Sequence, residues 1–221
     1  LPPQSSNLFH AISVVTAPCF PIRYNRSVTR LDQQLSFILE IDKLKTVLRQ
    51  TLLTDKSRRE NSAEHSWHLA VMAMLMTEYA VEPVDLLRAV KMVLIHDIVE
   101  VDAGDTFAYD TVALAEKDVR EQRAAERLFG LLPPEQGREF RRLWEEFEAR
   151  QTPESKYANA LDRLQPLLHN SVTEGGTWRI HNVTRNKVLK RMEPVKIGMP
   201  EVYPVVERIV EKACAVGWIK T

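Results

Sequence analysis

The segment that follows one apolar run concentrates the residue types that bind metal ions and transfer protons. Residues 92–95, Met-Val-Leu-Ile, are followed within ten positions by His96, Asp97, Glu100, Asp102 and Asp105. The first of these should still be buried, and buried imidazoles and carboxylates need partners; a divalent metal ion suits both. On a helix, Glu100 shares a face with His96 and Asp97, because it lies four and three residues after them. The segment therefore indicates a metal bound by His and Asp, with a carboxylate one turn later that can hold a water.

Two other segments place polar residues in apolar helices. His65 and His68 lie three residues apart, so both can face the same way, and either could equally be a core histidine satisfied by a neighbour. Asp162 lies in the apolar run 158–164, and a buried carboxylate is costly without a positive partner. Pro166 follows four residues later and cannot donate to the Asp162 carbonyl, which predicts a bend in the helix beside Asp162.

The order of these residues resembles the H…HD…D signature of the HD-domain metal-dependent phosphohydrolases, an all-helical superfamily. Residues 58–65, Arg-Arg-Glu-Asn-Ser-Ala-Glu-His, resemble the RxENxxEH segment of its bacterial 5′-deoxynucleotidase branch. Residues 96–105 resemble the HDxxE-x₃-GD segment of that branch, and residues 160–162 resemble its helical aspartate element. The resemblance covers about residues 35–170, and the ordered motifs together are far more specific than any one of them.

The resemblance implies that His65, His96, Asp97 and Asp162 hold one divalent metal ion. Two neutral imidazoles and two carboxylates suit a borderline ion such as Mn, Co, Fe, Ni or Zn, and Mg is also considered. A single ion with open positions can bind a phosphate oxygen and a water together. His68 is outside the family pattern, and we expect it either to contact the metal ligands without binding the metal or to pack in the core.

The same resemblance implies roles for four further residues. Glu100 would orient or deprotonate the water, and Asp105 would position that water or protonate the departing 5′ oxygen. Arg58 would contact the phosphate, because a planar guanidinium matches phosphate oxygens. Arg49 is a second candidate for this contact; the alternative is an arginine at a solvated helix end.

The chain also departs from the deoxynucleotidase branch next to the site. Gln50 follows Arg49, where the branch has a tryptophan associated with sugar selection. After Asp105 the sequence continues Thr-Phe-Ala-Tyr and not with the Pro-rich turn of the branch. The metal site is therefore better defined by the sequence than the substrate.

The spacing of apolar residues predicts an all-α fold, a single-domain helical bundle of about seven to eight helices over residues 32–221. Apolar residues recur at three- and four-residue steps from 35 to 48, and the polar stretch 54–61 is predicted to be a loop. Further helices are predicted from 62, over 86–96, 112–129, 135–150, 153–170, 178–193 and 202–216. No segment shows the alternation expected of a strand.

Residues 1–31 differ in composition from the rest. They contain no acidic residue, and Arg23, Arg26 and Arg30 stand among Ser and Pro. We expect an irregular N-terminal arm lying on the body of the protein or sequence foreign to it; an organellar transit peptide has the same composition.

Composition limits the partners. Lys+Arg and Asp+Glu both number 30, so the chain lacks the basic excess that a nucleic-acid polymer attracts, whereas a small anion needs only local cations. No apolar run is long enough for a membrane span. Cys19 and Cys214 are far apart and form no CxxC pair, which favours ordinary thiols in a reducing compartment and a cytoplasmic location.

The favoured function is hydrolysis of a phosphomonoester, namely a (deoxy)nucleoside 5′-monophosphate. A phosphodiesterase or pyrophosphohydrolase acting on other nucleotides is the alternative enzyme, and it would need more cations than Arg49, Arg58 and Arg59. A catalytically silent nucleotide- or metal-binding regulatory module is the non-enzymatic alternative, but such a module would need neither Glu100 nor Asp105. A homodimer is expected, because the tail is rich in apolar residues that either cover the core or form a dimer contact: Val202, Val205, Val206, Ile209, Val210 and Trp218.

Overall fold

The main helices begin where capping residues precede the predicted helical segments. The Thr29 and Asn61 side chains each accept a hydrogen bond from the backbone N–H of the third helical residue, whose own side chain accepts one from the backbone N–H of the cap. Thr152 does the same before Pro153. The Asp85 side chain accepts a hydrogen bond from the Arg88 backbone N–H at the start of α3 (Leu86–Ile95). These caps satisfy amide groups that have no partner inside a helix.

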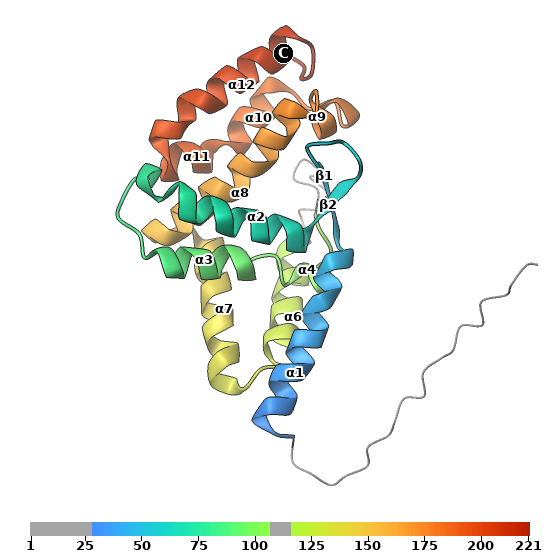
Figure 1. Cartoon of the computed structure of the whole chain (residues 1–221), viewed down its shortest axis with the longest axis vertical. Coiled ribbons are helices and arrows are strands. Elements are labelled where there is room, and N and C mark those ends of the chain that lie inside the picture. The colour runs from blue at the N-terminus through green and yellow to red at the C-terminus, as the bar shows by residue number, and fades with distance from the viewer. Residues whose placement is uncertain (1–27, 107–115) are drawn as a thin grey trace, which may run out of the picture.

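The computed structural model describes residues 28–106 and 116–221 (Figure 1). Its helices are α1 (Arg30–Ile41), α2 (Ser62–Leu75), α3 (Leu86–Ile95), α4 (Glu100–Ala103), α6 (Lys117–Phe129), α7 (Pro134–Ala149), α8 (Pro153–Val172), α9 (Gly176–Ile180), α10 (Arg185–Arg191), α11 (Glu193–Gly198) and α12 (Tyr203–Ala215). Short 3₁₀ turns, η1 (Asp42–Thr46), η2 (Thr77–Tyr79) and η3 (Pro200–Val202), join some of them. The predicted all-α class is confirmed.

The division into helices differs from the prediction in the tail. The helix predicted over 178–193 is interrupted, and α9, α10 and α11 stand in its place. Asn182 adopts a left-handed conformation with φ 51°, which ends the first piece, and Thr184 caps the second. Pro194 lies in the first turn of the third piece. The described part of the chain therefore contains more, and shorter, helices than the seven or eight predicted.

A small hairpin is the other departure from the prediction. Strand β1 (Leu48–Leu52) pairs antiparallel with β2 (Arg59–Asn61). The loop predicted over 54–61 contains β2, and the helical stripe predicted from 35 to 48 ends earlier, with α1 at Ile41. Arg49 and Thr51 are the buried residues of β1, whereas Leu48 is exposed. The usual alternation of apolar residues inside and polar residues outside is reversed, which is why the strand pattern is not visible in the sequence.

Helix α8 is the central element of the described fold. It packs against α2, α3 and α7 on one side and against α9, α11 and α12 on the other, as Figure 1 shows. It continues through Pro166 to Val172. Most of its residues are buried, including polar ones such as Asn159, Asp162 and Gln165. The fold therefore places polar side chains at its centre, where each needs a partner.

The tail residues cover the core. Val202, Val206 and Val210 are buried and belong to the main apolar cluster, which Trp218 also contacts. Of the two roles predicted for these apolar residues, the structure shows the first. No helix in the described ranges is both long and apolar enough to cross a membrane.

The predicted N-terminal arm lies largely outside the described residues, which begin at Val28. Its last two residues, Arg30 and Leu31, already belong to α1. The helix predicted over 112–129 is described only from Lys117 onward, as α6.

Candidate metal centre

The predicted ligands come from two helices and from the turn that follows a third. The cap at Asn61 sets the start of α2, so His65 lies at the end of its first turn. His96 and Asp97 follow directly after α3, in the turn that leads to α4. Asp162 projects from the middle of α8, beside α2 in the fold (Figure 1).

The structure brings all four side chains together in the interior. His65 is fully buried, and His96, Asp97 and Asp162 are 4 to 7% exposed. His65 Nε2 lies 3.0 Å from Asp162 Oδ1, and His96 Nε2 lies 3.9 Å from the same oxygen. His96 Nε2 also lies 3.0 Å from Asp97 Oδ1. Ligand atoms of His65, His96 and Asp162 all fall within 4.8 Å of one another, a spacing that can enclose one ion.

The donor set fits a cation. His96 Nδ1 lies 2.9 Å from the Val93 carbonyl oxygen, which can only accept, so Nδ1 carries the proton. The lone pair of a neutral His96 is then on Nε2, facing the carboxylates of Asp97 and Asp162. Nε2 makes no hydrogen bond within the described structure despite these short distances. A metal at this point would satisfy all of these electron pairs at once, with the Val93 bond fixing the tautomer.

The charges around the group hold its two aspartates in the ionised form. Burial alone would raise the pKa of Asp97, but the positive charge of Arg49, and that of the His96 ring when it is protonated, outweigh burial and hold that pKa well below its usual range. Burial acts on Asp162 in the same way, and the Arg163 guanidinium with the His65 hydrogen bond keeps its pKa well below normal. Ionised carboxylates are the form that binds a metal.

Glu100 and Asp105 line the same cavity, but their surroundings raise the pKa of each carboxyl group, whereas the pKa values of Asp97 and Asp162 are lowered. Burial, reinforced by the charge of Asp97, raises the pKa of Glu100 well above its usual range. The Ser62 hydroxyl donates to Glu100 Oε2 at 2.6 Å. Burial also raises the pKa of Asp105. Both side chains line the cavity that exposes His96, Asp97 and Asp162.

The two predicted phosphate-binding arginines have different positions. Arg49 is 7% exposed in β1, so the alternative of a solvated helix end is wrong. Its Nη1 donates to Asp97 Oδ2 at 2.7 Å, and its Nη2 is 3.9 Å from Asp162 Oδ1. Arg58 is exposed and donates two hydrogen bonds to Glu64, at 2.9 and 2.6 Å. Arg58 is not among the residues that line the cavity, so its contact with phosphate stays a prediction.

Several cations at this cavity were not anticipated from the sequence. Arg163 pairs with Asp162, the residue before it. Three more come from α10, whose sequence Arg-Asn-Lys-Val-Leu-Lys-Arg is a visible basic run but lies far from the motifs in sequence. The cations lining the cavity beside Arg49 are Lys117, Arg150, Arg163, Lys187, Lys190 and Arg191.

Comparison with known proteins agrees with this geometry. A model of the HD domain family matches residues 41–203. The 5′-deoxynucleotidase HDDC2 of Homo sapiens is 31% identical over 141 residues, which are 63% of this chain and 68% of that protein. The Bos taurus protein of the same name is 32% identical, over 63% of this chain and 67% of its own.

A crystal structure of a "predicted metal-dependent phosphohydrolase" from Magnetospirillum magnetotacticum MS-1 is also similar. It is 56% identical, has a TM-score of 0.83, and the match covers 87% of this chain and 96% of that one. The helical fold and the group of buried His and Asp side chains are those expected of a metal-dependent phosphohydrolase. The chain belongs to the HD domain family, and the family resemblance read from its motifs is confirmed.

Proposed function

We propose that this protein hydrolyses nucleoside 5′-monophosphates, deoxynucleotides among them, to nucleoside and phosphate. The observation that carries the proposal is that ligand atoms of His65, His96 and Asp162 lie within 4.8 Å of one another, with Asp97 Oδ1 3.0 Å from His96 Nε2. Glu100 and Asp105 line the same cavity, which is open enough to admit a ligand. The similarity to proteins named 5′-deoxynucleotidase supports the substrate class.

The four converging side chains would hold one divalent ion, which supplies a Lewis acid for a phosphoryl oxygen and makes water easier to deprotonate. Glu100 then accepts a proton from the attacking water, a role that suits a carboxylate whose pKa burial raises, since a raised pKa makes it a stronger base. The water oxygen forms a bond to phosphorus while the bond from phosphorus to the 5′ oxygen breaks. Asp105, whose pKa is also raised, donates the proton that the 5′ oxygen requires. Arg49 lies close enough to the ligands to contact a phosphoryl oxygen.

A second candidate function is favoured by the cations at the cavity. The sequence argued against larger phosphate chains because only Arg49, Arg58 and Arg59 were expected nearby. Arg163, Lys187 and Lys190 also line the cavity, so it has the charge to hold a di- or triphosphate. A pyrophosphohydrolase acting on nucleoside triphosphates is therefore the alternative.

We also propose that the protein is a cytoplasmic homodimer. One face of α1 exposes four apolar side chains that form a single helical stripe: Leu31, Leu35, Ile38 and Leu39. A second copy of the chain would cover this stripe in a dimer. Cys214 is a free thiol, in keeping with a reducing compartment.

The proposed function is tested by phosphate release from metal-stripped protein. Ribo- and deoxyribonucleoside mono-, di- and triphosphates are each supplied with Mn²⁺, Co²⁺, Mg²⁺ or no added ion. Metal-dependent release from monophosphates is expected. Release from triphosphates alone selects the pyrophosphohydrolase, and tight metal binding without turnover of any substrate contradicts both enzymes.

A further inference from the structure

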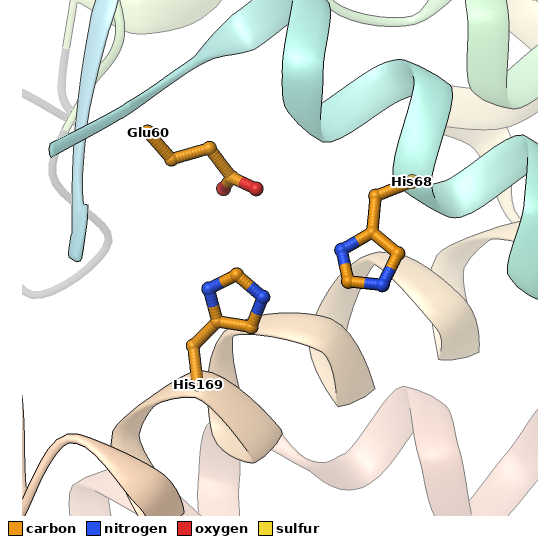
Figure 2. A group of neighbouring side chains, drawn as sticks. All are labelled: Glu60, His68 and His169. Atoms are coloured by element: carbon orange, nitrogen blue, oxygen red, sulfur yellow. The ribbon is translucent and has the colours of Figure 1, made fainter. Parts of the chain in front are cut away.

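A second group of metal-ligating side chains lies behind the candidate metal centre. Glu60 on β2, His68 on α2 and His169 on α8 each offer a ligand atom, and these atoms lie within 4.8 Å of one another. Figure 2 shows the Glu60 carboxylate and one ring nitrogen of each histidine directed toward a common space. Glu60 and His169 are 2 and 5% exposed, and His68 is partly buried.

The second group repeats the arrangement of the first along the same two helices. His68 follows His65 by three residues on α2, which is nearly one turn. Gln165 and His169 follow Asp162 by three and seven residues on α8, which keeps them on one face. The packing that brings His65 to Asp162 therefore also brings His68 to Gln165 and His169.

The amide of Gln165 stands at the centre of the group and does not satisfy it. Its Nε2 lies 2.6 Å from Glu60 Oε1, 3.3 Å from His68 Nδ1 and 3.2 Å from His169 Nε2. An amide nitrogen has two hydrogens, so it cannot donate to three acceptors. The other end of the amide, Gln165 Oε1, is buried and has no hydrogen-bond partner among the described residues. Buried polar groups left in this condition are uncommon and need an explanation.

Both histidines can present a lone pair to this space. His169 Nδ1 lies 3.0 Å from the Leu52 carbonyl oxygen, so Nδ1 carries the proton and a neutral His169 has its lone pair on Nε2. A bond from the far ring nitrogen to a backbone carbonyl is the usual support of a metal-binding histidine. Burial lowers the pKa of His68, which favours its neutral form. Glu60 supplies a carboxylate oxygen that lies within 4.8 Å of the ligand atoms of both histidines.

We propose that Glu60, His68 and His169 form a second divalent-metal site, distinct from the group of His65, His96, Asp97 and Asp162. Two imidazoles and one carboxylate select a borderline transition ion of the zinc, cobalt or nickel type over Mg²⁺ or Ca²⁺. Rotation of the Gln165 amide by half a turn puts Oε1 where Nε2 stands, which adds an oxygen as fourth ligand. The ion then satisfies every electron pair that the amide nitrogen leaves unmatched.

Glu60 connects the two groups. Its Oε1 faces the second group, whereas its Oε2 lies 3.6 Å from His65 Nδ1, on the ring whose Nε2 faces the candidate metal centre. An ion bound in the second site would therefore attract the Glu60 carboxylate, which also lies against the His65 ring. We propose that this ion positions the His65 ring and takes no direct part in the reaction.

The test is zinc binding, measured without reference to catalysis. Metal-stripped protein is loaded with Zn²⁺, freed of excess ion, and its zinc content per chain determined by elemental analysis. His68→Ala is the main variant, because His68 is only partly buried, and circular dichroism confirms that it is folded. His181→Ala is the matched control, because His181 is exposed and remote from both groups in sequence.

One zinc fewer per chain in His68→Ala than in the wild type, with His181→Ala unchanged, is the expected result. Gln165→Glu should bind the second zinc more tightly, because it replaces the amide with a charged ligand. Anomalous diffraction at the zinc edge should show a peak between Glu60, His68 and His169. Equal zinc content in His68→Ala and wild type, or the absence of that peak, overturns the proposal. Neither result bears on phosphate release, so the proposed function is judged separately.

Discussion

The His65 imidazole and the Asp162 carboxylate lie 3.0 Å apart, although 97 positions separate them in the chain. This contact joins α2 to α8, the two helices that contribute to both groups of metal-ligating side chains. The packing of this pair of helices therefore brings together His65 with Asp162 and His68 with His169.

Substitution of Asp162 tests the candidate metal centre most directly. Asp162→Asn keeps the shape of the side chain but removes the charge, so we expect the Mn²⁺ affinity of the candidate metal centre and the activity to fall by about 100-fold or more. Elemental analysis and phosphate release with excess Mn²⁺ measure the two effects. Asp118→Asn, at an exposed position on α6, is the matched control. Normal metal content in Asp162→Asn would show that the ion binds elsewhere.

Glu100→Gln separates proton transfer from metal binding. We expect kcat to fall about a hundred- to ten-thousand-fold, because the amide cannot accept the proton of the attacking water. Metal content should stay at the wild-type level, since Glu100 is not among the four converging side chains. Ser62→Ala removes only the hydroxyl that donates to Glu100, so its loss should be about tenfold. A wild-type kcat in Glu100→Gln would rule out Glu100 as the base.

The two arginines predicted to bind phosphate should behave differently. Arg49→Ala removes a buried cation that contacts Asp97, so we expect kcat/KM to fall and the metal-free protein to lose about 3 kcal/mol of unfolding free energy. Arg58→Ala breaks a surface pair with Glu64; if Arg58 makes no contact beyond this pair, KM should stay within about twofold of the wild type. Steady-state kinetics and urea denaturation measure both. A large rise in KM for Arg58→Ala would mean that Arg58 reaches the bound phosphate.

The cations of α10 distinguish the two candidate substrates. Replacement of both Lys187 and Lys190 by Ala removes two charges from the cavity lining. We expect KM to rise more for nucleoside triphosphates than for monophosphates, because a longer phosphate chain reaches more of the cations. Lys196→Ala, an exposed lysine on α11, is the control. An equal effect on both substrates would remove the argument for the pyrophosphohydrolase.

The exposed face of α1 predicts the oligomeric state. Leu35→Glu combined with Ile38→Glu places charges on a stripe that is 48 and 57% exposed at these two positions. If this stripe is the dimer contact, the variant should be a folded monomer where the wild type is a dimer. Light scattering after gel filtration gives the mass of each. A wild-type monomer, or a variant that remains dimeric, contradicts the assignment of this face.

The sequence by itself determined the class of fold and was enough to predict the metal ligands and the proton-accepting glutamate. Helix periodicity and caps such as Asn61 with Glu64 are local patterns, so they are readable from neighbouring residues. The order of His65, His96-Asp97 and Asp162 predicted the four ligands, because that order resembles the H…HD…D signature of the HD-domain phosphohydrolases. Glu100 followed from its spacing on the same segment.

Tertiary structure alone decided which other polar residues join them. Arg49 is buried because its hairpin reverses the usual alternation, and no local pattern shows this. His68, Gln165 and His169 meet only because α2 and α8 face each other over more than one turn. Likewise, α10 adds Lys187 and Lys190 to the cavity across a break in the predicted tail helix. These contacts join residues far apart in sequence, and their register depends on the packing of whole helices, which the local spacing of residues does not specify.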